Sequence, residues 1–167
     1  QDGDGKVYLG AAAYITGNWD SDAVVFVSND NGVTWNWNEP EIIQATNANE
    51  GVNFFFYNDK LYALVEGGNE LGVTLTLYVR ENDNSWTKIS DVITNIDNCG
   101  IMLPAFETVC IDGDVVFQKN SNPSDTCQGI ASDPIVFGDG TVKVFYAEFN
   151  DDGDFKYKSV DITEYLG

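Results

Sequence analysis

Short apolar runs alternate with small turn-forming residues along almost the whole chain, and this pattern constrains the fold more than any other feature. The runs are rich in Val, Ile, Phe, Tyr and Thr, and they end at Asn, Asp or Gly. That alternation is typical of β-strands joined by tight turns, and almost no stretch indicates a helix. We therefore expect an all-β protein. The expected strands are 6–15, 23–28, 52–57, 61–66, 73–79, 108–111, 115–119, 134–137, 141–149 and 155–160.

Two sequence elements recur along the chain. The first is a turn followed by a strand of similar character, seen at Asp2–Gly5, Asn58–Lys60, Asp112–Asp114 and Gly138–Gly140. The second is longer: residues 24–43 are repeated at 77–93, and more loosely at 145–162. Successive units lie about 50 residues apart, a period typical of propeller repeats. We therefore expect one β-propeller-like domain of about three four-stranded antiparallel blades. The blade-like units are 1–46, 47–97 and 98–167.

Three blades are too few to close a ring. Propellers close with about 4–8 blades, and an open arrangement exposes unpaired strand edges. We therefore expect a partial propeller or fragment, whose partners are other protein chains that self-assemble with it or supply the remaining blades. Residues 120–133 resemble a loop where outer strands would be expected.

One octapeptide carries a strong family resemblance. Its sequence, SNDNGVTW, has Ser28, Asp30, Gly32, Thr34 and Trp35 at the defined positions of S-x-D-x-G-x-T-W. It resembles the Asp-box, the bacterial neuraminidase repeat of sialidase-like β-propellers. The resemblance implies a hairpin turn between two outer strands of a blade. The Ser and Asp would bond turn amides, the Gly would take a positive φ, and the Trp would pack between blades. A degenerate copy keeps Asn82, Asp83 and Trp86.

The residues needed for sialidase chemistry are not assembled in this chain. Sialidases use an arginine cluster for the substrate carboxylate, together with a tyrosine–glutamate pair. This chain has a single arginine, Arg80, and no histidine, the commonest general base. We therefore expect a non-catalytic module for adhesion or for building a matrix or filament.

A second, weaker resemblance keeps an enzymatic alternative open. The segment SDPIVF at 132–137, followed by Gly-Asp-Gly and VKVFYAEF, is similar to five-bladed furanosidase-like glycoside hydrolases. Such enzymes use carboxylates as acid and base. The resemblance implies Asp133 as the carboxylate of interest, with Glu66, Glu107 or Glu148 as candidate acids. The structural alternative is that Pro134 opens a strand and that these glutamates lie on exposed faces.

The strong negative charge restricts the partners. Asp and Glu total 27 against 8 Lys and Arg, a net charge of −19, which repels nucleic acid. No apolar run approaches the roughly 20 residues that span a bilayer, so membrane insertion is not expected. No cofactor is expected apart from Ca²⁺, which prefers carboxylate oxygens. Its candidate ligands are Asp151, Asp152 and Asp154, although these, Asp2/Asp4 and Asp112/Asp114 all suit solvated turns as well.

The remaining signals concern location and ligand. Cys99, Cys110 and Cys127 form an odd set, from which we expect a Cys99–Cys110 disulfide. With the loop-rich composition this favours an extracellular or cell-surface protein. Carbohydrate is the favoured small ligand. Trp19 and Trp37 are the candidate exposed aromatic residues for stacking on sugars, although packing would also explain them.

Overall fold

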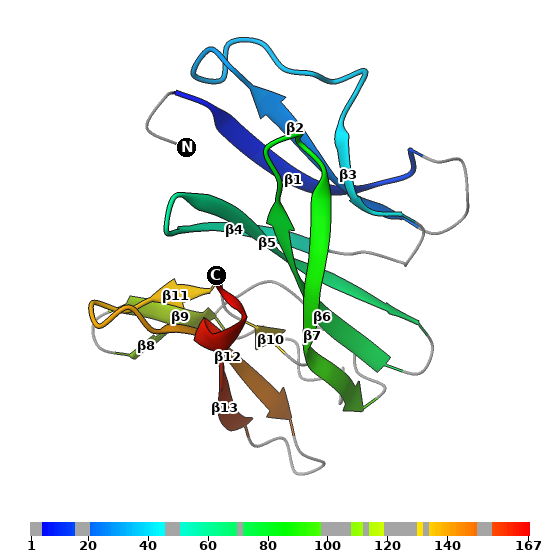
Figure 1. Ribbon diagram of the computed structural model, residues 1–167. Coiled ribbons are helices and arrows are strands. Elements are labelled where there is room, and N and C mark those ends of the chain that lie inside the picture. Colours follow the sequence, from blue (N-terminus) through cyan, green and yellow to red (C-terminus); the bar gives the residue numbers. More distant parts are fainter. Residues whose placement is uncertain are drawn as a thin grey trace. The chain divides into compact units, whose positions relative to one another are not determined.

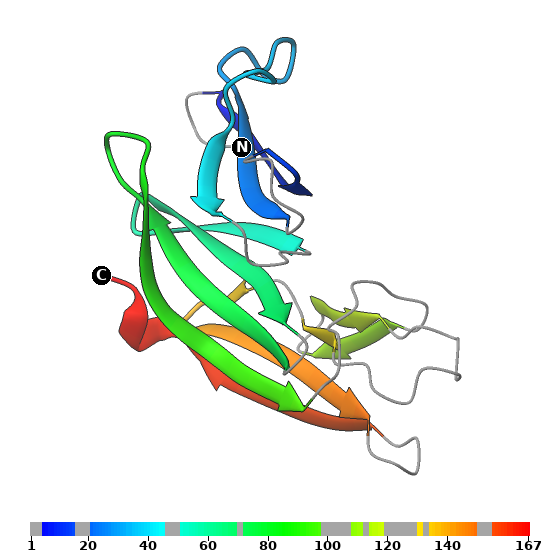
Figure 2. The ribbon, with the colours of Figure 1, turned by 90° about the vertical axis from the view of Figure 1, so that its right-hand side faces the viewer.

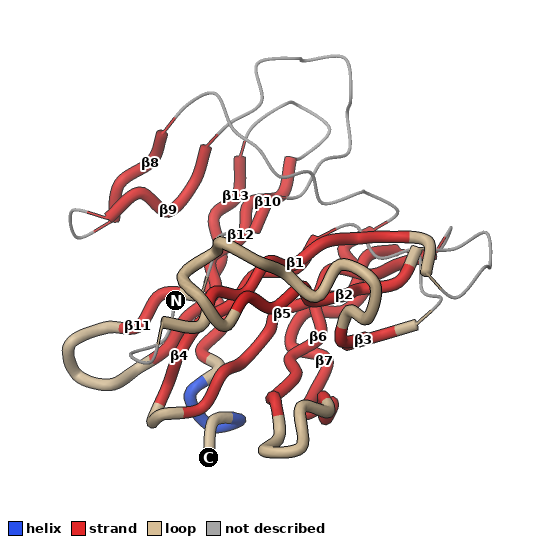
Figure 3. The backbone as a smooth tube through the Cα atoms, turned by 90° about the horizontal axis from the view of Figure 1, so that it is seen from above, coloured by secondary structure: helices blue, strands red, loops and turns tan. Residues whose placement is uncertain are grey.

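The computed structural model describes residues 5–15, 21–45, 51–69, 72–97, 108–111, 114–118, 130–131, 134–149 and 155–167. Within these ranges the regular secondary structure is strand, apart from one turn of 3₁₀ helix near the C-terminus (Figures 1 and 3). The all-β prediction is confirmed. Three antiparallel sheets of three or four strands are present, and none of them is closed, which fits a partial propeller-like arrangement.

The first two sheets follow each other in the sequence. The first has the order β1-β2-β3, formed by Val7–Ala13, Asp22–Ser28 and Glu41–Gln44. The second has the order β4-β5-β6-β7, formed by Gly51–Tyr57, Lys60–Asn69, Gly72–Arg80 and Trp86–Asp97. The four strands of the second sheet lie side by side in Figure 2. Strands β3 and β7 lie mostly within the internal repeat, but neither is among the strands expected from the sequence.

The later strands form a pair and a further sheet. Strand β8 (Thr108–Ile111) pairs with β9 (Asp114–Gln118). Strand β12 (Val142–Phe149) pairs with β13 (Phe155–Asp161), and the short strands β10 (Ile130–Ala131) and β11 (Ile135–Val136) also pair with it. Strand β10 lies where the sequence indicated only a loop. The 3₁₀ helix η1 (Thr163–Tyr165) follows β13.

The chain divides into two compact units, residues 1–68 with 76–90 and residues 69–75 with 91–167. In the first unit, one face of the β1–β3 sheet packs on strands of the second sheet. The buried cluster there consists of Ala23, Val25, Val27, Ile43, Ala63, Val65 and Tyr78. Tyr8, Val52, Phe54 and Trp86 pack against its edge. Because side chains alternate between the two faces of a strand, this cluster takes every second residue of β2 and β5.

Tight turns connect the paired strands where the sequence predicted them. Asn58 and Asp59 both have positive φ angles, of 47° and 61°, in the two-residue connection from β4 to β5. Two successive positive φ angles are the requirement of a type I′ hairpin turn, which Asn and Asp tolerate. The Gly138–Gly140 turn closes with Gly140 N–H donating to Phe137 O at 2.9 Å. Residues 1–4 and 112–113 of the other predicted turns lie outside the described residues.

Candidate functional site

The turn that follows β2 is held by the buried hydroxyl of Ser28. Gly32 N–H donates to Ser28 Oγ at 2.8 Å, and Asp30 N–H donates to the same oxygen at 3.4 Å. The Ser28 hydroxyl in turn donates to Asp30 Oδ1 at 2.8 Å. Asn31 and Gly32 take positive φ angles of 58° and 88°, which reverse the chain within a few residues. The side chain of Ser28 therefore satisfies backbone groups that the turn cannot satisfy itself.

The carboxylate of Asp30 closes the second half of the turn. It accepts the Thr34 hydroxyl at 2.6 Å and Thr34 N–H at 2.8 Å. These bonds, the Thr34 hydroxyl first, lower the pKa of Asp30 from 3.8 to about 2, because they stabilise the charged form. Asp83 forms a shorter version with the N–H and hydroxyl of Ser85, at 3.0 and 2.6 Å. The repeated elements thus share a carboxylate-centred turn.

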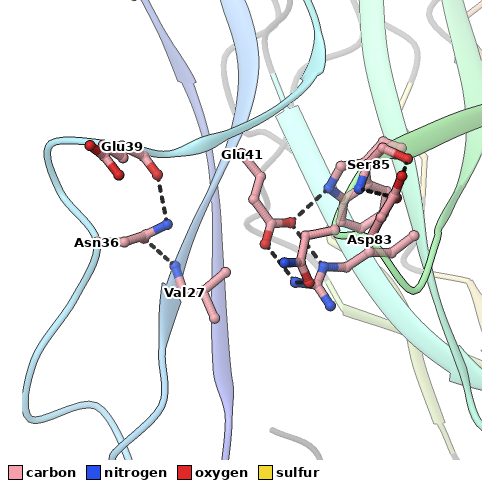
Figure 4. Close-up of polar contacts among 9 residues, drawn as sticks. Val27, Asn36, Glu39, Glu41, Asp83 and Ser85 are labelled. Carbon is pink, nitrogen blue, oxygen red and sulfur yellow. Dashed lines mark hydrogen bonds and ion pairs between the residues drawn. The ribbon is translucent and has the colours of Figure 1, made fainter.

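The residues after the turn are fixed to β2 by Asn36, whose position no sequence signal revealed. Asn36 Oδ1 accepts Val27 N–H at 2.6 Å, and Asn36 Nδ2 donates to Glu39 O at 2.9 Å (Figure 4). Asn36 N–H also donates to Val27 O at 3.2 Å. The amide therefore extends the pairing of β2 beyond β3. Its neighbours Trp35 and Trp37 are held in place as a result.

Three aromatic rings form a continuous cluster beside this turn. Trp35 and Trp37 stack with centroids 5.5 Å apart, and Trp37 lies 4.9 Å from the ring of Phe26. The indole N–H of Trp35 donates to Gly32 O at 3.0 Å, so the inner ring is tied to the turn. Trp37 remains 54% exposed. We call Phe26, Trp35 and Trp37 the aromatic cluster.

The aromatic cluster continues onto the outer face of the first sheet. Leu9 pairs with Phe26 across β1 and β2, and Ile42 pairs with Val24 across β2 and β3. Paired residues lie on the same face of a sheet, and this face is opposite the buried cluster. Leu9 and Ile42 are 44% and 41% exposed. An apolar surface with one prominent indole is suited to contact the apolar face of a sugar ring or another protein.

Arg80, the only arginine of the chain, forms an ion pair that joins the second sheet to the first. Arg80 Nε and Nη2 donate to the two carboxylate oxygens of Glu41 at 2.9 and 2.6 Å (Figure 4). Trp86 Nε1 donates to Glu41 Oε2 at 3.0 Å. The guanidinium also lies 5.4 Å above the ring of Tyr8 and donates to Asn84 Oδ1 at 2.6 Å. We call Arg80, Glu41 and Trp86 the clamp. The role of Glu41 was not visible in the sequence, because nothing links residues 39 positions apart.

Two of the four candidate carboxylates for glycoside hydrolysis, Glu66 and Glu148, lie within the described residues. Glu66 lies in β5 opposite Gly51 and is only 5% exposed, so the structural alternative that placed it on an exposed face is wrong. Leu64, two residues earlier on the same face of β5, is also buried, so this face of the strand is covered. Glu148 lies in β12 opposite Lys156. Glu107 and Asp133 lie outside the described residues.

Several other predicted site residues also lie outside the described ranges. These are Trp19, Cys99, Cys127, Asp2, Asp4, Asp112, Asp151, Asp152 and Asp154. Cys110 is in β8. Because Cys99 is not among the described residues, the Cys99–Cys110 disulfide stays a prediction. Among the described residues, no three His, Cys, Asp or Glu side chains gather to hold a metal ion. The described part of the chain also has no helix long and apolar enough to cross a membrane.

Comparison with known proteins leaves the family open. No protein-family model matches the sequence, and no curated protein shows significant similarity to it.

Proposed function

We propose that this chain is a non-catalytic, extracellular propeller-like module of the Asp-box type, which serves adhesion or matrix assembly and binds carbohydrate at the aromatic cluster. The observation that carries the proposal is Trp37, which is 54% exposed although Trp35 and Phe26 pack against it. A rigid exposed indole loses little conformational entropy when a sugar stacks on it. Leu9 and Ile42 are exposed apolar residues on the sheet face that carries Phe26, and such a surface suits the C–H face of a pyranose ring.

The state of Arg80 supports a role without sialidase-type catalysis. Its side chain is 13% exposed and forms a bidentate ion pair with Glu41. An arginine that binds a substrate carboxylate has to present its fork-like donors to the ligand. Here two of those donors are used by Glu41 and a further contact goes to Asn84. This arrangement favours a structural task for Arg80.

The proposal is tested by sugar binding at Trp37. We expect intrinsic tryptophan fluorescence to change in proportion to bound neutral oligosaccharide. Trp37→Ala should lose about 0.5–1.5 kcal/mol of binding free energy or more, the range for aromatic contacts beyond their buried area. Tyr14→Ala is the matched control, because Tyr14 is an aromatic residue outside the cluster that is even more exposed, at 70%. Equal binding by wild type and Trp37→Ala would refute the site.

A glycoside hydrolase fragment is the second candidate, and the burial of Glu66 favours it. Glu66 is only 5% exposed, and glycoside hydrolases can hold one of their two carboxyl groups in an apolar pocket. We expect this alternative to show itself as hydrolysis of chromogenic glycosides that is lost in both Glu66→Gln and Asp133→Asn. Binding to immobilised glycans without any turnover would instead favour the non-catalytic module.

A further inference from the structure

Strand β1 ends the first sheet, and its outer edge lacks the usual protection. Its sequence, VYLGAAA, has no charged residue and no proline, and its register with β2 is uninterrupted from Val7 to Ala13. Natural edge strands are normally blunted by charge, proline or a bulge, because their free backbone groups attract other strands. Of the described strands, only β2 pairs with β1.

The direction of the free backbone groups follows from Asn36. Both Val27 N–H and Val27 C=O are bonded to Asn36, so they point away from β1. The pair Tyr8–Val27 is therefore a non-hydrogen-bonded pair, and such pairs alternate along an antiparallel ladder. The pairs Gly10–Val25 and Ala12–Ala23 are of the same kind. Hence the N–H and C=O groups of Gly10 and Ala12 point to the outer edge.

The second sheet shows which kind of strand pairs with the edge that corresponds to the outer edge of β1. The hairpin β2–β3 and the hairpin β6–β7 are the two copies of the internal repeat at 24–43 and 77–93. This correspondence makes β1 the counterpart of β5. Strand β4 pairs with β5 over seven residues, Gly51 to Tyr57, and no strand among the described residues takes the corresponding place in the first sheet. Its sequence, GVNFFFY, is uncharged and aromatic.

We propose that the outer edge of β1 takes up an extended, uncharged, aromatic-rich peptide strand from another polypeptide chain, in antiparallel orientation. Main-chain bonds to Gly10 and Ala12 would supply affinity, as in other cases of strand addition. In the second sheet Phe54 lies opposite Ala63. A phenylalanine opposite Ala12, which is exposed, would repeat that pairing, since aromatic side chains cover small residues of a neighbouring strand. This strand site is independent of sugar binding.

The test uses a synthetic peptide with the sequence of residues 51–57, flanked by lysines for solubility, added to the full chain. Amide hydrogen exchange is followed residue by residue by NMR. We expect exchange at Gly10 and Ala12 to slow by at least about tenfold. Leu9 and Ala11, whose amides already point to β2, should be unaffected. A peptide of the same composition in scrambled order controls for attraction between lysines and the acidic chain.

Two variants separate strand pairing from other binding. Ala12→Pro removes an outward N–H and should therefore abolish protection at Gly10. The variant should still fold, because proline is tolerated at a sheet edge. Ala12→Lys keeps the N–H but places a charge at the exposed edge, which should also weaken protection at Gly10. This variant replaces Ala12→Pro if circular dichroism shows that the proline variant does not fold. The proposal is overturned by unchanged exchange, or by equal protection with the scrambled peptide. Protection without peptide that grows with protein concentration would assign the edge to a second copy instead, and Trp37→Ala should leave the peptide effect intact.

Discussion

At the scale of single residues, the turn after β2 depends on the hydroxyl of Ser28. It is almost fully buried and accepts the Gly32 and Asp30 amides. We expect Ser28→Ala to lower the free energy of unfolding by about 1–3 kcal/mol, because it leaves the half-buried Gly32 N–H without its acceptor. Urea denaturation measures this. The control is Ser85→Ala in the corresponding turn, where the residue is exposed and water can replace the lost bond. Equal losses in the two variants would contradict the argument.

The turn carboxylates also predict how stability depends on pH. The pKa values of Asp30, Asp83, Asp139 and Asp161 are all lowered, each chiefly by hydrogen bonds from a nearby Ser or Thr. Since the folded pKa lies below the unfolded one, their contribution is complete above about pH 4 and is lost as the pH falls through the folded values. For Asp30 the window runs from 3.8 down to about 2.

The variant Asp30→Asn isolates this contribution. Its melting temperature should lie below that of the wild type at pH 6, and the difference should shrink between pH 4 and about 2. Comparing two proteins at each pH removes the general effect of net charge, which changes almost equally in both. A difference that stayed constant down to pH 2 would mean that the ionised carboxylate is not what holds the turn.

At the scale of elements, the clamp joins β3 to the β6–β7 hairpin. Removing one partner should cost about 3–5 kcal/mol, because it leaves a mostly buried charge uncompensated. We expect Arg80→Leu and Glu41→Leu each to lower the urea midpoint strongly, and the double variant to lose less than the sum. Additive losses would show that Arg80 and Glu41 are not coupled. Trp86→Phe, which removes only one donor to Glu41, should have a smaller effect.

The approach of β1 to β4 depends on Gly10. A Cβ atom added there would lie 2.7 Å from Val52 Cβ and 3.0 Å from Phe54 Cε2. We expect Gly10→Ala to destabilise the protein by about 1–3 kcal/mol through overpacking, measured by thermal unfolding. Gly138→Ala is the matched control, because nothing lies within 4 Å of its added Cβ. Tolerance of alanine at residue 10 would indicate that the two strands can separate at little cost.

The sequence predicted elements better than it predicted contacts. Regular alternation and Asn, Asp or Gly at the ends located β1, β2, β4, β5 and β8 closely. Strand β3 was missed because four residues, EIIQ, are too short to show a period, and β7 because Lys88 and Asp91 interrupt its apolar pattern. The clamp depends on residues far apart in the chain, and neither local period nor motif can reveal such a pair.

At the scale of the whole molecule, a net charge of −19 opposes any assembly of identical copies. Electrostatic repulsion is screened over about 30 Å at 0.01 M salt and about 3 Å at 1 M. If the chain assembles with itself, sedimentation should show a larger oligomeric fraction as NaCl rises from low to high concentration. CaCl₂ at matched ionic strength separates screening from calcium binding, because specific binding makes Ca²⁺ more effective than Na⁺ in promoting assembly. Specific binding would also mean that a chelator lowers the melting temperature. A monomer in every salt would remove self-assembly and leave the β1 edge to a different chain.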